Sequence, residues 1–533
     1  MRNATGFGGK WAQIGGVDIQ EMIGASKICA VVAAGSAAAM LRQLKRALAQ
    51  TKTIELRLDW LANDGEIERF LARLAESGAR RSKMRGRAIL IATCRRREAG
   101  GRYRGTIAKQ LVHLGAALRA GCEWYDLEIE SASRCPGELL DVLLGEGQQI
   151  CSAHFFQRAP KYFKRVVATL SSGRPDAIKI AAQCESLSEA RRVMAIARGR
   201  RDAIAVPMGD VALPMRVLAL REGRNFVYAP VENATAPGQV SFSEMVNLYR
   251  ADRISRRTRV YGVIGNPISH SLSPQLQNAG FQARGIDAVY LPFLVRDLKD
   301  FCDSIVALSV KGFSVTLPHK EAILRYLDDC DELAASIRAV NTVSVRANGT
   351  LFGYNTDYVG VLRALERRMP LRGSRVLIFG AGGVARAIAF ALSRAGASVG
   401  ICARRAARAT ALARAARGEA IARKHLRSEF FDAIVNATPV GMHPAIEHSP
   451  LEARELNCRL VFDTIYRPRV TKLMQLAAHR GIETVSGVEM FVAQGTAQWE
   501  IWTGQRAPEK AMRAAVLAAL EREENRQRGR RSA

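Results

Sequence analysis

Residues 375–405 read RVLIFGAGGVARAIAFALSRAGASVGICARR, and this stretch decides the fold of the second half of the chain. A short apolar run, residues 376–379, is typical of a strand buried on both faces, and a glycine-rich turn and a helix follow it. Residues 398–402 supply a second strand. The glycines allow a tight turn, and the helix amino terminus presents free N–H groups to a pyrophosphate. The stretch therefore predicts the opening of a Rossmann domain. Its expected cofactor contacts are Gly380, Ala381, Gly382, Gly383, Val384 and Ala385.

Two features of this stretch bear on the cofactor. Ala385 stands where the third glycine of G-x-G-x-x-G is expected, so a glycine-rich turn in an ordinary α/β domain stays open as an alternative. An NAD site usually ends its second strand with Asp or Glu, which binds the ribose 2′-hydroxyl. Here Arg404 and Arg405 occupy that place. Guanidinium groups suit a 2′-phosphate by charge and by bidentate geometry, so these residues favour NADP.

Length and composition predict a globular protein of two or three domains. The chain has 533 residues, 48% hydrophobic and 24% charged. A net charge of +29 would ordinarily suggest nucleic acid as a partner. However, arginine is spread along the whole chain, and its one dense cluster is at the carboxyl terminus. We expect the excess to attract anionic substrates and phosphorylated cofactors, and a basic nucleic-acid-binding protein remains the alternative from another class.

Cysteine usage and hydropathy predict the compartment. The ten cysteines include no C-x-x-C pair and lie far apart, so we expect neither a zinc site nor a disulfide framework, but a reducing cytosol. No run approaches ~18 apolar residues, and the beginning of the chain has no apolar signal core. We therefore expect a cytoplasmic protein that is neither exported nor inserted in a membrane. Residues 1–26 are glycine-rich without periodicity and are expected to form a poorly ordered extension.

From Ile28 onward, short apolar segments recur with helical stretches between them. Strands that alternate with helices imply parallel β/α units, and eight such units within residues 28–250 match the size of a closed barrel. We therefore expect an α/β protein that opens with a (β/α)8 barrel. The eight expected strands are ICAVVA (28–33), TIELRL (53–58), AILIAT (88–93), WYDLEI (124–129), QQICSA (148–153), DAIKIA (176–181), DAIAVP (202–207) and NFVYAP (225–230).

Polar side chains on or after these strands would face a barrel active site, because the carboxyl ends of barrel strands do so. Lys179 stands within an apolar strand, where burial favours the neutral, nucleophilic amine. A lysine paired with an acid of a neighbouring strand is the alternative, and a structural histidine is the alternative for His154. A lysine able to form a Schiff base, a histidine to move protons and several arginines for a carboxylate suggest imine chemistry on a small keto acid.

The motifs of residues 28–250 resemble type I 3-dehydroquinate dehydratase. They are IELRLDW, TCRRREAGG, YDLEIE, CSAHFF, IKIA and TAPGQV, in that order. The resemblance implies that Lys179 is the Schiff-base lysine, His154 the proton-transfer residue and Glu98 its orienting acid. It also implies a set of substrate-binding residues: Glu55, Arg57, Arg95, Arg216, Thr235 and Gln239. The chain departs from the family pattern at Val31, Phe155, Pro214, Met215 and Thr235.

A second group of motifs begins after the charged segment 251–260. YGVIGNPISHSLS (261–273) offers two serine hydroxyls from an extended segment. GFSVTLPHKEAI (312–323) carries Lys320, and GYNTDYVG (353–360) carries Asp357. A lysine and an aspartate that converge on one hydroxyl would form a proton-transfer pair for hydride chemistry.

With GAGGVARA, NATPVGM (436–442), DTIYRPRVT (463–471) and GVEMFVAQGTAQWEIWTG (487–504), residues 259–520 resemble shikimate dehydrogenase. The resemblance implies that Lys320 and Asp357 are the catalytic pair. The residues that it implies for shikimate are Ser271, Ser273, Thr316, Asn341 and Gln494. Those that it implies for the nicotinamide cleft are Asn436, Thr438, Met442 and Gly487. After the second Rossmann strand the chain reads Ala403-Arg404-Arg405, which keeps the family's arginine but neither of its polar neighbours.

Together the two resemblances predict a bifunctional enzyme of the shikimate pathway. The barrel would dehydrate 3-dehydroquinate, and the second half would reduce 3-dehydroshikimate to shikimate with NADPH. An inactive barrel that serves as a scaffold for a shikimate or quinate dehydrogenase is the leading alternative. The assembly is left open, a homodimer included. The expected parts are 1–26, an extension; 27–252, the barrel; 257–360, a shikimate-binding domain completed by about 488–522; 361–487, a Rossmann domain; and 523–533, a basic tail.

Overall fold

In the computed structural model the chain forms two compact units; the first ends at Arg257 and the second begins at Thr258. The structure describes residues 26–77, 88–135, 138, 140, 145, 147–198, 200–223, 225–232 and 238–531, with side chains in the last helix up to 526. No helix in the described part of the chain has both the length and the apolar character to cross a bilayer.

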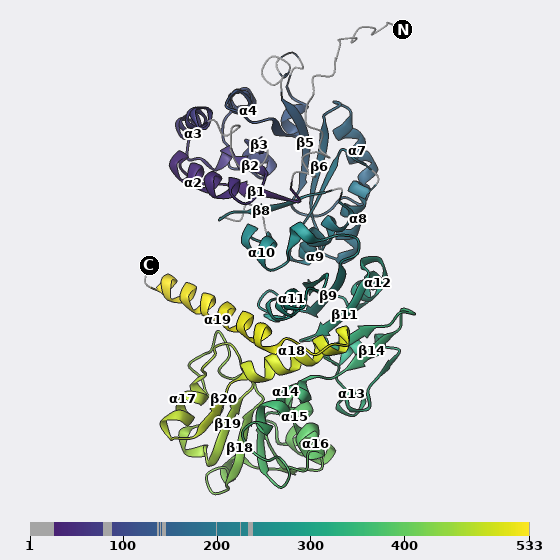
Figure 1. The fold of residues 1–533 in the computed structure, drawn as a ribbon, viewed down its shortest axis with the longest axis vertical. Helices are drawn as coiled ribbons and strands as arrows, with labels where there is room; N and C mark the ends of the chain where they lie inside the picture. Colours follow the sequence, from purple (N-terminus) through teal and green to yellow (C-terminus); the bar gives the residue numbers. More distant parts are fainter. Residues whose placement is uncertain are drawn as a thin grey trace. The chain divides into compact units, whose positions relative to one another are not determined.

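The first unit is a parallel barrel (Figure 1). Its sheet runs β7-β6-β5-β4-β3-β2-β1-β8, and the neighbouring strands in this order pair in parallel, as predicted. Between β7 and β8, the side-chain amide of Asn225 donates to the carbonyl of Ala205 at 3.0 Å and helps to bring the last edges together. The strands are β1 (Ile28–Val32), β2 (Thr53–Arg57), β3 (Ile89–Thr93), β4 (Trp124–Glu128), β5 (Gln148–Phe155), β6 (Ala177–Gln183), β7 (Ala203–Met208) and β8 (Val227–Pro230).

Helices surround the barrel, and several begin where the sequence offers a cap. Ser36, Asn63 and Thr106 accept backbone N–H groups at the starts of α2, α3 and α4, which satisfies donors that have no partner within the helix. The barrel interior below the active site is filled with apolar side chains, among them Ile91 and Trp124. The helices are α2 (Ala37–Leu48), α3 (Asp64–Glu76), α4 (Ile107–Arg119), α5 (Ile129–Ala132), α7 (Phe163–Ser171), α8 (Leu187–Arg198), α9 (Leu213–Leu218) and α10 (Phe242–Asn247).

The second unit opens with a mixed sheet in the order β10-β9-β11-β13-β14-β12. Two helices from the end of the chain, α18 (Gly487–Thr503) and α19 (Glu509–Arg531), pack against α11 of this part (Figure 1). Gly280 and Gly312 permit this packing, because a Cβ there would lie 2.7 and 2.5 Å from the indole nitrogens of Trp499 and Trp502. The other elements are β9 (Arg259–Gly265), α11 (Ser273–Ala283), β10 (Ala288–Leu294), α12 (Leu298–Leu308), β11 (Val310–Val315), β12 (Asp329–Cys330), α13 (Glu332–Ile337), β13 (Thr342–Val345) and β14 (Leu351–Tyr354).

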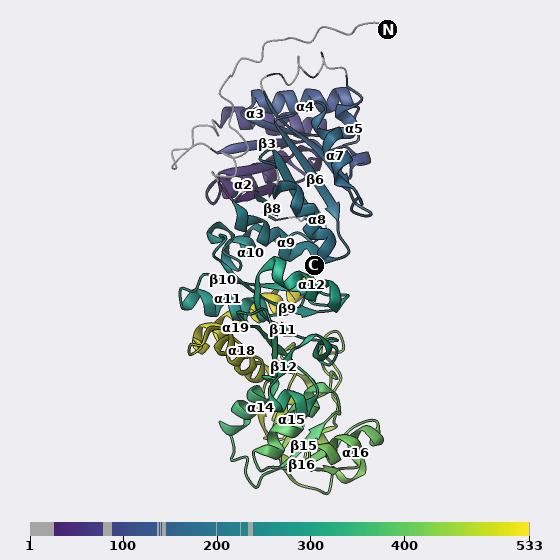
Figure 2. The same cartoon turned by 90° about the vertical axis from the view of Figure 1, so that its right-hand side faces the viewer.

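The predicted Rossmann domain follows α14 (Asp357–Glu366), and Figure 2 shows β15 and β16 beside α15 and α16. Its six-stranded parallel sheet has the order β17-β16-β15-β18-β19-β20. Successive strands are added on one side of β15 up to β17 and on its other side from β18, so the strand order reverses between β15 and β18, where dinucleotides bind in such sheets. The remaining elements are β15 (Arg375–Phe379), α15 (Gly383–Arg394), β16 (Ser398–Cys402), α16 (Ala406–Ala415), β17 (Glu419–Ala420), β18 (Phe431–Asn436), β19 (Cys458–Asp463), α17 (Lys472–His479) and β20 (Glu483–Val485).

The end of the chain differs from the prediction. We expected a basic tail from residue 523, but α19 continues to Arg531. Glu523 pairs with Arg467, and Glu524 pairs with Arg469 at 3.3 Å. Acidic residues among the terminal arginines therefore tie the helix to the loop after β19, and the count of basic residues alone did not reveal this.

Candidate active sites

A cavity of about 780 Å³ opens at the carboxyl ends of the barrel strands. Seven of the residues singled out from the sequence line it, although they come from separate strands and loops. These residues are Glu55, Arg57, Arg95, His154, Lys179, Arg216 and Gln239. Thr235 lies outside the described residues.

Lys179 lies on β6 and is 5% exposed. Its ammonium donates to Asp126 Oδ2 at 2.9 Å and lies 3.6 Å from Glu55 Oε1. It also lies 4.0 Å from the centre of the Tyr228 ring. The lysine is therefore both buried in the cavity and paired with an acid, Asp126 of β4, which β5 separates from β6 in the sheet. This pairing offsets the cost of burying its charge.

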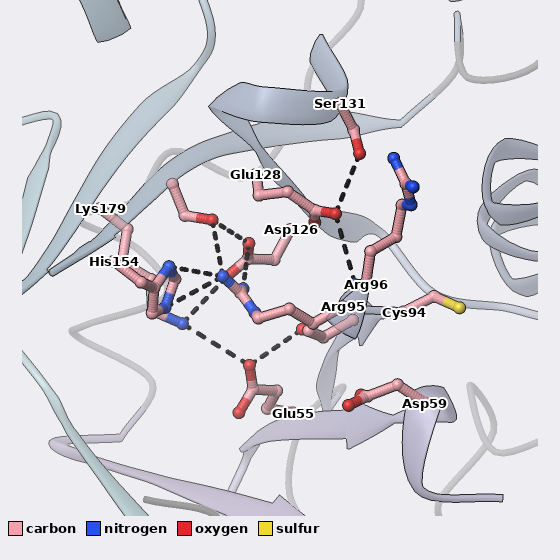
Figure 3. Close-up of polar contacts among 12 residues, drawn as sticks. Glu55, Asp59, Cys94, Arg95, Arg96, Asp126, Glu128, Ser131, His154 and Lys179 are labelled. Atoms are coloured by element: carbon pink, nitrogen blue, oxygen red, sulfur yellow. Dashed lines mark hydrogen bonds and ion pairs between the residues drawn. The ribbon is translucent and has the colours of Figure 1, made fainter. Parts of the chain in front are cut away.

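Asp126, which the sequence did not single out, is the centre of this cluster (Figure 3). Its carboxylate accepts hydrogen bonds from Arg95 Nη2 and from Ser152 Oγ, both at 2.6 Å, as well as from Lys179. Burial raises the pKa of this carboxyl, but the charges of Arg95 and Lys179 outweigh burial and hold the pKa well below its usual value. Asp126 thus stays ionised and holds two cations beside the cavity. Its position as an acid within an apolar strand, WYDLEI, was the signal that could have identified it.

His154 ends β5 beside Arg95. Arg95 Nη1 lies 2.6 Å from Nδ1 and 3.0 Å from Nε2 of the imidazole. A guanidinium can only donate, so the imidazole must present a lone pair to it. Burial, together with the positive charges of Arg95 and Lys179, lowers the pKa of His154 well below its ordinary value. The ring is therefore a neutral base at neutral pH, and Phe156 stacks on it at 5.8 Å between ring centres.

Glu98 does not have the place that the resemblance implied. Its side chain is 65% exposed and pairs with Arg96 at 3.1 Å, whereas the imidazole of His154 is hydrogen-bonded to Arg95. The physical reason is local: in the short 3-10 helix Arg97–Ala99, it is Ala99 that is buried, while Glu98 faces solvent. In this arrangement Arg95, not Glu98, contacts His154, and the orienting role of Glu98 stays a prediction.

Two further arginines of the cavity are held by protein groups. Arg57 forms two bonds of 2.9 Å to the carboxylate of Asp59. Arg216 donates to the carbonyls of Pro207 and Gly238, and its burial lowers its pKa to about 10. Both guanidinium groups thus have fixed positions at the edge of the cavity.

A second cavity, of about 720 Å³, lies in the second unit. It is lined by residues of the mixed sheet, of α18 and of the Rossmann domain, and it gathers most of the second set of sequence-predicted residues. These are Ser271, Ser273, Thr316, Lys320, Asn341, Asp357, Val384, Gly487 and Gln494.

Lys320 and Asp357 meet in this cavity. Lys320 Nζ donates to Asp357 Oδ2 at 2.5 Å, and Asn341 Nδ2 donates to Asp357 Oδ1 at 2.8 Å. Asp357 is the first residue of α14, where the positive end of the helix dipole favours a negative charge. The carboxylate is therefore fixed on both oxygens, and it positions the lysine at the cavity wall.

A long cleft adjoins this cavity and joins Lys320 and Thr316 with the glycine-rich turn. Among the predicted cofactor residues, it is lined by Gly382, Gly383, Val384, Thr438 and Met442. Asn436 fixes this wall: its Oδ1 accepts from the backbone N–H of Thr438 at 3.0 Å, and its Nδ2 donates to Asp463 at 3.0 Å. Burial raises the pKa of Asp463 to about 6.

The glycine-rich turn has the shape that a dinucleotide needs. Gly380 has φ of 129°, and a Cβ there would lie 2.9 Å from the carbonyl oxygen of Ala437. A Cβ at Gly382 or Gly383 would meet nothing within 4 Å, so open space lies in front of the turn. Ala385, in place of the third glycine, is buried within α15. These observations fit a pyrophosphate at this helix terminus.

A side cavity, smaller than the long cleft, lies against Ala381, Gly382 and Gly383 and extends along α16. Arg408, which the sequence analysis did not single out, lines it, whereas Arg404 and Arg405 are exposed and line none of the four described cavities. Arg408 lies on the first turn of α16, four residues after Arg404, and its place at the start of the helix after the second Rossmann strand was the signal that could have identified it.

Three family models match the chain. Type I 3-dehydroquinase matches residues 28–256, the shikimate dehydrogenase substrate-binding domain matches 263–343, and the shikimate 5'-dehydrogenase carboxyl-terminal domain matches 487–517. The chain is 33% identical over 510 residues to the chloroplastic bifunctional 3-dehydroquinate dehydratase/shikimate dehydrogenase of Arabidopsis thaliana, which covers 91% of this chain and 83% of that protein.

The second unit also matches single-function proteins. It is 41% identical over 274 residues to a shikimate dehydrogenase (NADP(+)) of Bacillus cereus, which covers 49% of this chain and 99% of that protein. A crystal structure of shikimate 5-dehydrogenase from Thermus thermophilus with NADP(H) and shikimate is 34% identical and covers 49% of this chain and 100% of that chain, with a TM-score of 0.46.

Proposed function

The chain belongs to the family of bifunctional 3-dehydroquinate dehydratases/shikimate dehydrogenases, and we propose that it catalyses both reactions of that name. Its barrel converts 3-dehydroquinate to 3-dehydroshikimate, and its second unit reduces that product to shikimate with NADPH. The observation that carries the proposal is that each unit has its own cavity with a complete acid and base set: Lys179, Asp126 and His154 in one, Lys320 and Asp357 in the other.

In the barrel, we propose Lys179 as the nucleophile. Asp126 and Glu55 are the nearest carboxylates to its ammonium; because Asp126 stays ionised, we propose that Glu55 accepts the proton that the lysine must lose. The free amine adds to the ketone carbon, and loss of water gives a protonated imine. Glu55, Arg57, Arg95, Arg216 and Gln239 surround the space in which the hydroxyls and the carboxylate of the substrate would lie.

His154 then acts as the base. The protonated imine withdraws electrons, so the neighbouring C–H becomes acidic and the neutral imidazole removes its proton. The imidazolium returns this proton to the departing hydroxyl, which leaves as water. Hydrolysis of the imine then frees 3-dehydroshikimate and Lys179. Arg95 orients the ring through its hydrogen bond, and Asp126 and Ser152 in turn hold Arg95.

In the second unit, NADPH supplies the hydride that the substrate carbonyl carbon receives. We propose that Gly382, Gly383 and Val384 face this cofactor, with Thr438 and Met442 on the opposite wall and Arg404, Arg405 and Arg408 near its adenosine phosphate. Lys320 gives a proton to the carbonyl oxygen, and Asp357 holds the lysine in place. The cavity is also lined by the residues that would bind the hydroxyls and the carboxylate of shikimate: Ser271, Ser273, Thr316, Asn341 and Gln494.

One assay tests both halves. Purified full-length protein receives 3-dehydroquinate and NADPH, and oxidation of NADPH is followed by its absorbance. We expect turnover with 3-dehydroquinate and, in a separate reaction, with 3-dehydroshikimate. Turnover with 3-dehydroshikimate alone would show that the barrel is a scaffold, and NADP reduction with quinate but not with shikimate would favour a quinate dehydrogenase.

We also propose a cytoplasmic location and domain limits of 27–252, 257–360 and 361–487, with a homodimer as the assembly to test by light scattering. Small molecules are the partners of both cavities. All ten cysteines of the chain are free thiols, which suits a reducing compartment.

A further inference from the structure

Arg338 lies at the place where two cavities of the second unit meet. The long cleft contains Lys320 and the wall of Thr438 and Met442, whereas the side cavity extends along α16 to Arg408. A small set of residues lines both cavities. They are Glu321, Arg338, Gly382, Gly383 and Arg386.

The residues that line both cavities lie where one group of the cofactor, its pyrophosphate, would be. If the nicotinamide lies in the long cleft and the adenosine in the side cavity, the pyrophosphate that joins them must cross between the two, in front of Gly382 and Gly383. That turn is the expected pyrophosphate site of a Rossmann domain. Arg338 and Arg386 therefore lie where two negative charges would be placed.

The two arginines come from different parts of the second unit. Arg386 is on the first turns of α15, and its Nη1 donates to the carbonyl of Ile337 at 3.4 Å. Arg338 follows Ile337 directly, at the end of α13. In the described part of the chain, no carboxylate is paired with either guanidinium, although Glu321 lines the same place. Two positive charges against one negative charge leave the site net positive.

Arg338 has an unfavourable backbone conformation for a residue with a Cβ. Its φ is 56°, and its backbone N–H caps α13 by donating to Ala334 and Ala335. Glycine is the residue that adopts this left-handed conformation without strain. The backbone conformation alone would favour glycine at this position, so a role for the arginine must come from its side chain.

We propose that Arg338 and Arg386 clamp the pyrophosphate of the cofactor, with Arg338 reaching it from the shikimate-binding side of the cleft. The proposal rests on the proposed binding of NADPH at the glycine-rich turn. In this arrangement, the cofactor links α13 to α15 through its pyrophosphate. The clamp acts on a group that NADPH and NADH share, unlike the arginines near the 2′-phosphate.

The test is Arg338→Gly in the full-length protein, with Arg417→Gly as the matched control. Arg417 has the same backbone conformation, with φ of 55°, and is exposed, but it lines neither cavity. Dissociation constants for NADPH and for NADH are measured by nicotinamide fluorescence, and the melting temperature is measured without cofactor. Glycine relieves backbone strain at both positions, so neither variant should melt at a lower temperature than the unmodified protein.

We expect Arg338→Gly to raise both dissociation constants by the same factor, about fivefold to twentyfold, which is the effect of losing one charge-assisted contact at a partly exposed site. Arg417→Gly should change neither. Unchanged binding, an effect on NADPH alone, or a lower melting temperature of Arg338→Gly would each overturn the clamp. If the unmodified protein itself binds no NADPH, it is the proposed function that fails.

Discussion

The two active sites of this chain arrange a lysine and an aspartate in different ways. In the barrel, the side chains of Lys179 and Asp126 are 7% and 0% exposed, and Asp126 also holds Arg95 and Ser152. In the second unit, the side chains of Lys320 and Asp357 are 17% and 9% exposed, and Asp357 holds one cation and one amide. The barrel site is a dense charged cluster, and the other site is a single pair beside an open cleft.

The difference follows from the source of the chemistry. The reaction that we propose for the barrel, loss of water, transfers no electrons to or from a cofactor, so in this proposal a lysine of the chain is the nucleophile and a histidine moves the protons. The second unit receives its hydride from a bound molecule, so it must leave room for that molecule and needs one positioned proton donor. Five predictions, in order of decreasing effect, test this contrast.

The largest effect is expected for the barrel lysine. Lys179→Ala removes the nucleophile, and we expect dehydratase turnover to fall by more than about 10⁴-fold, as when other covalent enzymes lose theirs. Borohydride added with 3-dehydroquinate should reduce the imine and attach the ligand to the peptide that contains Lys179, as mass spectrometry can show. The dehydrogenase activity of the same protein serves as the internal control. A label on Lys161 or Lys164 would disprove the assignment of the nucleophile.

The lysine of the second unit should matter less, because the hydride comes from the cofactor. Lys320→Ala should lower dehydrogenase turnover by roughly 10²- to 10⁴-fold, the usual range for a lost general acid, and leave the dehydratase intact. Lys311→Ala is the matched control, because Lys311 is an exposed lysine on β11. Loss of both activities in Lys320→Ala would indicate a folding defect instead.

Cofactor choice should show a smaller effect, because its arginines are at the surface. Arg408→Ala and Arg404→Ala should each raise the Michaelis constant for NADPH by about tenfold while barely changing that for NADH, because only NADPH has the 2′-phosphate. Because Arg408 lines the side cavity and Arg404 is exposed outside it, we expect the larger change for Arg408→Ala. Equal use of NADPH and NADH by the unmodified enzyme would contradict the preference for NADP.

The pH dependence of the two activities should differ as well. The pKa of His154 lies well below its ordinary value, so the imidazole is neutral at pH 6.5 and gains a proton only as the pH falls through the lowered pKa. We therefore expect kcat/KM of the dehydratase to keep its full value down to at least pH 6.5 and to decline below it. Measurement of both activities between pH 5 and 9 checks this. An acid limb of the dehydratase at or above pH 6.5 would show that His154 is more easily protonated than its surroundings imply.

The sequence could predict the eight barrel strands, the two Rossmann strands and most lining residues, because buried parallel strands leave apolar runs and active-site residues follow them. It could not predict what the third dimension decides. Asp126 and Lys179 are 53 residues apart, and only the closed barrel brings them to 2.9 Å. Arg338, at the end of α13, lines the same side cavity as Gly382 and Gly383, and no motif of the chain predicts that they lie together.

The smallest effect is expected at Glu98, where the motif and the structure disagree. The family resemblance of TCRRREAGG implied that this acid orients His154, yet its carboxylate is largely exposed and pairs with Arg96. An ion pair with one exposed member contributes about 0 to 1 kcal/mol, and the side-chain oxygen of glutamine can still accept a hydrogen bond from Arg96. We therefore expect Glu98→Gln to change the kcat and KM of the dehydratase by less than about threefold.

Ser152→Ala is the informative comparison, because Ser152 links Asp126 and Arg95 behind the histidine. Its loss should lower kcat and shift the acid limb, since Arg95 then holds the imidazole less firmly. A large loss of dehydratase activity in Glu98→Gln, with normal activity in Ser152→Ala, would mean that Glu98 turns toward His154 when substrate binds. The barrel site would then rearrange on binding and would not be the fixed charged cluster described above.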